Sequence, residues 1–191
     1  MDTVKPREGL PINAKLVFKG IMFEVWQWEQ EMFDGSIQTF ERIWREPTVH
    51  VIATVGDKIL IEEQDQPDRK NTINLVAGRA DHGDGMLEEA KRELLEETGH
   101  KSDDWELLFL NSTHGKLLYD SHFFIARNCK KVQEQNLDPG EKITPKLIDY
   151  KDFLMLTEEP RFWCSQEFVL FLLHLQMDPA KKEEFRKRLF P

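Results

Sequence analysis

Cysteine is scarce in this sequence, which has only Cys129 and Cys164 among its 191 residues. Disulfide-rich scaffolds need several cysteine pairs and cysteine metal sites need closely spaced thiols, so the sequence excludes both. Long apolar runs are also missing, since the longest covers residues 168–173 and a membrane helix needs ~20 such residues. The N-terminal residues contain no apolar signal stretch. We therefore expect a cytoplasmic protein without a membrane partner, whose two thiols are reduced and buried or half-buried.

Positive charge is in deficit, because 26 lysines and arginines stand against 35 aspartates and glutamates, which gives a net charge of −9. A polyanionic partner would have to approach against this repulsive field. Extended nucleic acid is therefore not expected as a partner. A small anion that is bridged to the protein by a metal ion remains compatible with the charge.

The first part of the chain reads as a small antiparallel β-region. Apolar and polar residues alternate over residues 15–31, with a break near Gly20, and again over residues 37–44. An Asp34-Gly35 pair between the two stretches is typical of a turn. Pro47 is a natural boundary, so we expect an N-terminal β-rich region over residues 1–47 and a main domain over residues 48–191.

The main domain mixes strands and helices, which predicts the α/β (α+β) class. Helical spacing over residues 86–98 ends at Gly99, a residue type that often closes helices in a left-handed conformation. The other elements that we expect are strands over residues 48–55, 58–62, 72–76, 105–111, 118–126 and 143–148, and helices over residues 161–176 and 179–189.

Carboxylates crowd one side of the predicted helix. At roughly 100° per residue, one arc holds Glu89, Glu93, Glu96 and Glu97, beside an apolar arc of Leu87, Ala90 and Leu94. A carboxylate-rich helix is often simply a solvated face. Like charges at this spacing repel, however, and repel more when they are desolvated. Carboxylate oxygens are the ligands that Mg²⁺ or Mn²⁺ prefers, so a divalent cation would remove the penalty.

The sequence of residues 78–100, GRADHGDGMLEEAKRELLEETGH, resembles the Nudix box, G-x5-E-x7-R-E-U-x-E-E-x-G-U, where U is a bulky apolar residue. The first glycine and the whole R-E-U-x-E-E-x-G core stand at the family's spacing. Two positions depart from the pattern. Asp84 replaces the first glutamate and shortens its reach by one methylene, and His100 replaces the final apolar residue.

This resemblance implies a Nudix fold, in which a mixed β-sheet lies between helices, and a cofactor that is Mg²⁺ or Mn²⁺. It also implies roles for the box residues: Glu93 and Glu97 as metal ligands, Glu96 as a ligand or as the group that positions water, and Arg92 as the residue that orients them.

Three short segments outside the box resemble ADP-ribose pyrophosphatases. One of them, NSTHG before LLYDSHFFIA within residues 111–126, is similar to a strand and glycine loop of that subfamily. The stretch LVAG at residues 75–78 is similar to the segment in which an alanine carbonyl, here that of Ala77, ligates a metal. The stretch GEKI at residues 140–143 is similar to a later acidic loop, where Glu141 would be a further catalytic or metal-binding carboxylate.

Four other residues are candidates for substrate binding. Trp26 and Trp28 project from one face of a predicted strand, where an indole could stack on a base, although a core or dimer-contact stripe fits them somewhat better. Arg45 and Arg79 could reach phosphate, and for each a solvated surface position is about equally compatible with the sequence.

The function expected from this resemblance is metal-dependent hydrolysis of a nucleoside diphosphate derivative, with ADP-ribose or another nucleoside diphosphate sugar favoured, to two monophosphates. Two alternatives stay open: a Nudix hydrolase of a different dinucleotide, and a nucleotide-binding sensor module without turnover. Unpaired strand edges and large indoles in the N-terminal region also lead us to expect a homodimer with that region at or near the interface.

Overall fold

The computed structural model describes residues 5–80 and 85–191. The chain forms two compact units: residues 1–47 with 111–121, and residues 48–110 with 122–191. The N-terminal part of the first unit ends at Pro47. Residues 111–121, from the later chain, complete this unit. Strands β9 (Asp104–His114) and β10 (Leu117–Arg127) each contribute residues to both units.

The first unit is built on three antiparallel strands, β1 (Lys15–Lys19), β2 (Phe23–Glu31) and β3 (Ile37–Arg45). The predicted turn is present, with Gly35 at φ 82° and the Asp34 carboxylate accepting a hydrogen bond from the Ser36 N–H at 3.0 Å. The beginning of β10 pairs with β3 in parallel. The sequence predicted a strand over residues 118–126 but not its pairing with β3, because the two strands are distant along the chain and the pairing leaves no local signal.

Strand alternation divides the two faces of this small sheet. Trp26 and Trp28 point to the same face and form a core with Ala14, where they are 0% and 7% exposed. The other face carries Phe18, Val25 and Ile43, which are cross-strand partners. Phe18 is 58% exposed and Ile43 is 41% exposed, so this second face presents apolar side chains to solvent.

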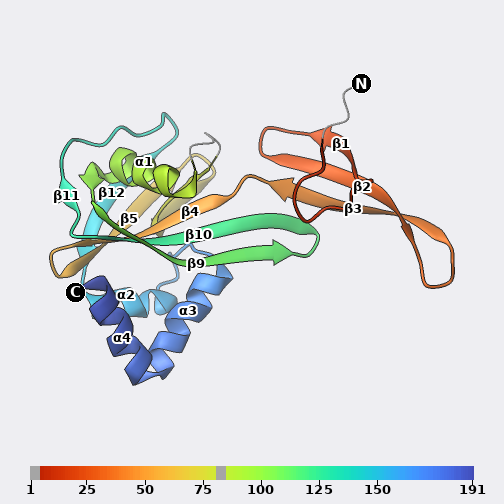
Figure 1. Ribbon diagram of the computed structural model, residues 1–191. Coiled ribbons are helices and arrows are strands. Elements are labelled where there is room, and N and C mark those ends of the chain that lie inside the picture. The colour runs from red at the N-terminus through yellow and green to blue at the C-terminus, as the bar shows by residue number, and fades with distance from the viewer. Residues whose placement is uncertain (1–4, 81–84) are drawn as a thin grey trace. The chain divides into compact units, whose positions relative to one another are not determined.

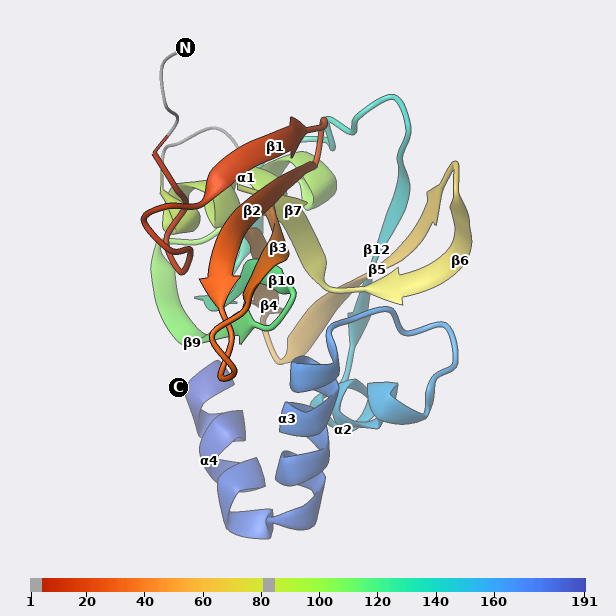
Figure 2. The same ribbon diagram turned by 90° about the vertical axis from the view of Figure 1, so that its right-hand side faces the viewer.

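The second unit contains a mixed sheet in the order β10-β4-β5-β12, with β4 at Thr48–Val55, β5 at Lys58–Gln66 and β12 at Lys142–Ile148. Strand β6 (Arg69–Asn74) pairs with β5, β7 (Val76–Arg79) pairs with β4, and β9 pairs with β10. Figure 2 shows β12 and β6 running beside β5. The short strands β8 (His100–Lys101) and β11 (Lys130–Lys131) form a separate pair.

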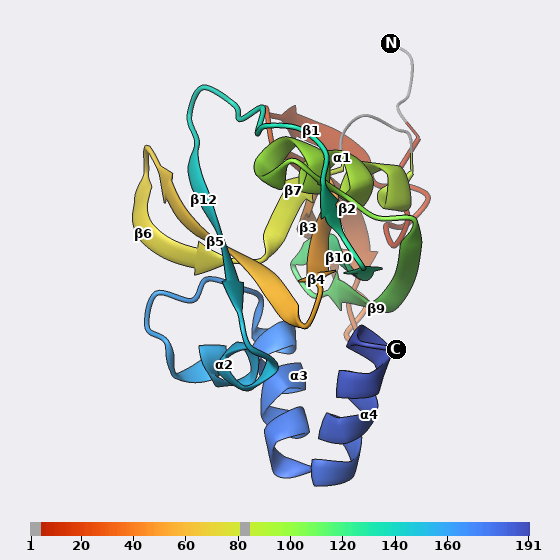
Figure 3. The same cartoon turned by 90° about the vertical axis from the view of Figure 1, so that its left-hand side faces the viewer.

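Helices cover both faces of this sheet (Figures 1 and 3). On one face, α1 (Met86–Thr98) packs Ala90 and Leu94 against Leu60 and other apolar residues of the sheet. On the other face, α2 (Tyr150–Leu154), the 3-10 helix (Met155–Glu158), α3 (Gln166–Met177) and α4 (Pro179–Leu189) pack against residues that include Ile59 and Ile61. The predicted fold class, a mixed sheet between helices, is confirmed.

The helix ends follow local chemistry. Helix α1 has the predicted bounds and ends at Gly99, whose φ is 73°. Helix α4 also has the predicted bounds, whereas α3 begins at Gln166 and not at Arg161. The reason is that residues 161–163 pair with Ile73, which donates its N–H to the Arg161 carbonyl and accepts from the Trp163 N–H, both at 2.8 Å.

Both cysteines are free, as predicted, with Cys129 buried and Cys164 half-buried. Burial raises the pKa of each thiol to about 12. Among residues 5–80 and 85–191, the structure contains no helix that could serve as a transmembrane segment.

Candidate active site

Glu97 joins the carboxylate-rich helix to the sheet. Its side chain is buried, with 3% of the residue exposed. One carboxylate oxygen, Oε2, accepts a hydrogen bond from the backbone N–H of Ala77 in β7 at 3.1 Å. This bond leaves Oε1 of Glu97 without a hydrogen-bond partner among the described residues, so one oxygen is held and the other is available.

Glu93 lies one turn earlier on α1, directly against Gly78. A Cβ atom at position 78 would lie 2.0 Å from the Glu93 Cδ atom, so only glycine leaves room for this carboxylate. The Glu93 side chain is 13% exposed. The first glycine of the box is therefore required here by the close approach of a catalytic candidate.

Arg92 organises three carboxylates of the same helix. Its guanidinium donates to Oε2 of Glu89 at 3.1 and 2.9 Å, to Oε1 of Glu93 at 2.5 Å and to Oε2 of Glu96 at 2.6 Å. A planar guanidinium with five donors suits such a fan of carboxylates. The Glu96 side chain is 36% exposed and lies beside this arginine, while Glu93 and Glu97 are more deeply placed.

Glu62 of β5 was not among the residues predicted from the sequence. Leu60 faces α1, and Ile59 and Ile61 face the opposite helices, so strand alternation directs Glu62 to the α1 face. It is 1% exposed, and its Oε1 atom has no hydrogen-bond partner in the part of the chain that the structure describes. A glutamate at an inward position that directly follows a buried apolar run is the signal that could have identified it.

Glu141 reaches this region on a loop that is tied to the end of α1. The Gln135 side chain donates to the carbonyl oxygen of Glu97, and the Asn136 N–H donates to the carbonyl oxygen of Glu96 at 2.9 Å. After the loop, β12 begins and pairs with β5. Glu141 is half-buried, and its Oε2 accepts from the backbone N–H of Asp138 at 3.3 Å.

The four carboxylates Glu62, Glu93, Glu97 and Glu141 influence one another's protonation. Burial, reinforced by the charges of Glu141 and Glu93, raises the pKa of Glu62 to about 8. Burial also raises the pKa of Glu93 to about 7, against the opposing effect of Arg92. Burial and the neighbouring carboxylates raise the pKa of Glu97 well above its usual range, and burial raises that of Glu141.

This carboxylate set fits a divalent cation. Hard oxygen donors suit Mg²⁺ and Mn²⁺, and a cation would relieve the repulsion between buried carboxylates that protons otherwise relieve. The unpartnered Oε1 atom of Glu62 is a donor that such an ion would satisfy. Within the described ranges, no three acidic, histidine or cysteine side chains already converge at ligating distance, so carboxylate rotations would have to complete the metal shell.

The candidate substrate-binding residues have different environments. Trp26 is fully buried and donates its indole N–H to Glu24 at 3.0 Å. Its ring is buried in the core of the N-terminal sheet in this structure. Arg45 places its guanidinium over the Tyr119 ring, 4.5 Å from the centroid. Arg79 is half-buried at the end of β7.

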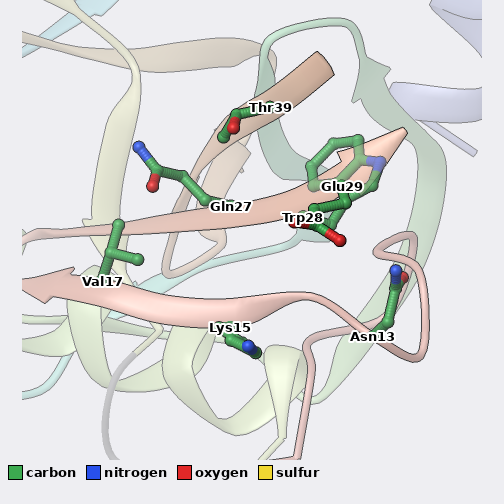
Figure 4. A pocket seen from close by; sticks show the side chains of 7 residues that line it. All are labelled: Asn13, Lys15, Val17, Gln27, Trp28, Glu29 and Thr39. Carbon is green, nitrogen blue, oxygen red and sulfur yellow. The ribbon is translucent and has the colours of Figure 1, made fainter. Parts of the chain in front are cut away.

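Trp28 is also mostly buried, but it borders a hollow of about 300 Å³ in the first unit. Figure 4 shows the lining residues, which come from the segment before β1 and from the strands β1, β2 and β3: Asn13, Lys15, Val17, Gln27, Trp28, Glu29 and Thr39. Most of the side chains that line this hollow next to Trp28 are polar.

The two departures from the box have different outcomes. Asp84 lies outside the described residues. His100 is half-buried, and its Nδ1 atom lies 3.0 Å from the Thr98 carbonyl oxygen. Burial lowers its pKa, so the ring is neutral at pH 7. A neutral, half-buried ring at the start of β8 replaces an apolar side chain without placing a charge in the packed region.

The fold is a mixed sheet between two helical layers, in which Gly78 of β7 lies against Glu93 of the glutamate-rich helix α1. The family model described as NUDIX domain matches residues 44–169. The chain therefore belongs to the Nudix family of hydrolases.

This chain is similar to two known proteins over most of their length. The methanol dehydrogenase activator of Bacillus methanolicus is 24% identical over 181 residues, which cover 93% of this chain and 97% of the relative. A solved structure described as an ADP compounds hydrolase has a TM-score of 0.69 at 21% identity and covers 85% of this chain and 90% of that one. The structural likeness supports the assigned fold.

Proposed function

We propose that this protein hydrolyses the pyrophosphate bond of a nucleoside diphosphate derivative, with ADP-ribose or another nucleoside diphosphate sugar as the favoured substrate, and that it uses Mg²⁺ or Mn²⁺. The observation that carries the proposal is the set of buried and half-buried carboxylates from α1, β5 and the loop before β12, which act on one another's protonation. The name of the solved relative, an ADP compounds hydrolase, supports an adenine nucleotide as the substrate.

Glu93, Glu96 and Glu97 would hold the metal, together with the Ala77 carbonyl, and Arg92 would keep Glu93 and Glu96 in position. Glu141 would either complete this shell or activate the water, and we favour the second role. The bound cation would neutralise phosphate oxygens and lower the pKa of a coordinated water. The Ala77 N–H fixes one oxygen of Glu97 and Arg92 fixes one oxygen of Glu93. Each carboxylate is thus oriented by the protein before a substrate arrives.

Glu141 is our candidate for the general base. In the reaction, a water oxygen forms a bond to one phosphorus, the bond from that phosphorus to the bridging oxygen breaks, and the water proton passes to the base. Because burial raises the pKa of Glu141, its carboxylate accepts a proton more readily than an exposed glutamate does. The products are two monophosphates.

Arg79 and Trp28 remain our candidates for contacting the phosphates and the base, and Arg45 for an additional phosphate contact. Arg79 is the residue directly after the Gly78 that contacts Glu93, so its backbone lies beside the carboxylate cluster. A guanidinium at that position suits an anionic substrate that approaches a protein of net negative charge.

The test is a panel of nucleoside diphosphate derivatives incubated with Mg²⁺, with Mn²⁺ or with a chelator, followed by chromatography of the products. We expect two monophosphates from ADP-ribose or a related compound, in the metal-containing samples only. Glu97→Gln should lower the rate by orders of magnitude while the protein stays folded. Full turnover in chelator contradicts the metal dependence, and nucleotide binding without turnover on any substrate would favour a sensor module.

We also propose that the N-terminal sheet forms a homodimer interface. One face of this sheet exposes Phe18 and Ile43 across neighbouring strands, with Val25 half-buried between them. Phe23, at the start of β2, is 42% exposed as well. An exposed apolar surface of this kind is typical of an interaction site.

A further inference from the structure

Glu62 is a buried carboxylate at a position where an apolar residue would stabilise the fold better. The residue lies in the middle of three strands, opposite Asn74 of β6 and Pro145 of β12. Apolar residues precede it at the inward positions of β5. An apolar side chain here would extend the core, whereas a glutamate places an oxygen atom in a buried site without a hydrogen-bond partner among the described residues.

The surroundings of Glu62 are acidic. The carboxylates of Glu93 and Glu141 are close enough to act on its charge, and Glu62 in turn acts on Glu97. A buried carboxylate with a purely structural role is usually paired with a lysine or an arginine. The structure gives Glu62 no ion pair within the described part of the chain. Like charges gathered in a buried site indicate that a positive ion belongs between them.

Three oxygen atoms of this cluster are free of hydrogen bonds to the described residues. Glu93 uses Oε1 to bind Arg92, and Glu97 uses Oε2 to bind Ala77. Within residues 5–80 and 85–191, no hydrogen bond reaches their other oxygens, Oε2 of Glu93 and Oε1 of Glu97, and the buried Oε1 of Glu62 has no partner there either. The pattern leaves one oxygen of each carboxylate for a common ligand, which is the donor chemistry of a hard divalent cation.

We propose that Glu62 is a further ligand of the divalent cation and binds it through Oε1 together with Glu93 and Glu97. This inference rests on the proposed metal dependence. It assigns to β5 a metal-binding role outside the box, and it explains why a carboxylate occupies an inward position of a core strand.

Strand β5 offers a matched control at the next residue. Glu63 points to the opposite face, and its carboxylate oxygens lie 3.6 Å from Lys146 Nζ and 3.7 Å from Arg161 Nη1. Its side chain is 43% exposed. Glu62→Gln and Glu63→Gln therefore remove the same group from neighbouring positions of one strand, the first from the buried α1 face and the second from the half-exposed opposite face.

The experiment measures Mn²⁺ binding to the full chain by calorimetry or by the electron paramagnetic resonance signal of free Mn²⁺, without substrate. We expect Glu62→Gln to raise the Kd for Mn²⁺ at least about tenfold and Glu63→Gln to leave it unchanged. The rise in Tm that Mn²⁺ produces should also shrink in Glu62→Gln. Glu62→Asp keeps the charge, withdraws the oxygen by one methylene and should weaken binding to an intermediate degree, which provides a second reading if Glu62→Gln folds poorly.

The outcomes separate this inference from the proposed function. Wild-type protein that binds no Mn²⁺ contradicts the metal dependence itself, and the inference falls with it. Wild-type protein that binds Mn²⁺ while folded Glu62→Gln binds it equally well leaves the proposed function intact and overturns the role of Glu62.

Discussion

The Glu93 carboxyl group lies where a side chain at position 78 would begin, since a Cβ atom on Gly78 would approach Glu93 Cδ to 2.0 Å and Glu93 Cγ to 2.5 Å. Strand β7 and helix α1 therefore meet through a glycine and a glutamate. The backbone of one residue sets the position of the other's carboxylate, although the two residues are distant in sequence.

Gly78→Ala should displace the Glu93 carboxylate and lower kcat at least about tenfold, because misplacing a catalytic group by about 1 Å can cost 10²-fold. Thermal unfolding should change little, since the side chain that must move is flexible. Gly115→Ala is the control, because a Cβ there meets nothing within 4 Å. Wild-type kcat in Gly78→Ala would show that the position of Glu93 does not limit the reaction.

Arg92→Lys keeps the positive charge and removes the planar fork that reaches Glu89, Glu93 and Glu96. A single ammonium cannot hold three carboxylates in this arrangement. We expect kcat to fall about tenfold or more while KM changes little, as measured by steady-state kinetics. Lys91→Gln is the matched control, because it removes only an exposed ion pair with Glu88. Equal effects of the two substitutions would contradict a positioning role for Arg92.

Glu141→Gln should lower kcat at least about tenfold, because a general base is typically worth about 10²- to 10⁴-fold in rate. The Tm should change little, since the residue is half-buried in a loop. Glu134→Gln serves as the control within the same loop, because that side chain is 89% exposed. An unchanged rate in Glu141→Gln would exclude Glu141 from proton transfer.

The stability of the metal-free protein should fall as pH rises. Folding raises the pKa of Glu62 to about 8 and that of Glu93 to about 7, from the usual 4.5. The folded state therefore holds protons that the unfolded state releases, and the stability that this provides is lost as pH rises from about 4.5 through these raised values. In chelator, we expect Tm to fall by about 5 °C or more between about pH 5.5 and about pH 8.5.

Glu62→Gln is the control for this pH dependence, since it removes the group whose pKa is raised to about 8. Its Tm should fall less steeply over the same pH range. Identical slopes in the variant and the wild type would show that other groups cause the dependence.

The proposed homodimer predicts that Ile43→Asp shifts the protein towards monomer in light scattering at micromolar concentration. A charge on the apolar face that also carries Phe18 would oppose association. Lys187→Glu changes an exposed charge on α4 and should leave the molecular mass unchanged. A monomeric wild-type protein at that concentration would contradict the proposal.

Local patterns predicted what local chemistry determines. The bounds of α1 follow from helical spacing and from Gly99, and the turn at Asp34-Gly35 follows from residues that favour it. The predicted start of α3 at Arg161 was wrong, because residues 161–163 pair with Ile73, which is distant along the chain. Glu62 was missed for a related reason. The apolar run before it marks an inward position, but its role depends on the packing of α1 and the loop before β12 near β5, and these segments are distant along the chain.

The Nudix box of this protein depends on residues outside it for its local structure. Two carbonyl groups in the last turn of α1, those of Glu96 and Glu97, accept from Asn136 and Gln135, and the Gln133 carbonyl oxygen would lie 2.1 Å from a Cβ at Gly99. Residues 78–99 transplanted into another scaffold would thus leave these carbonyls to water and lose the loop that brings Glu141. A designer who wishes to borrow this chemistry would have to move the helix together with residues 133–141, as one graft made from two separate stretches of chain.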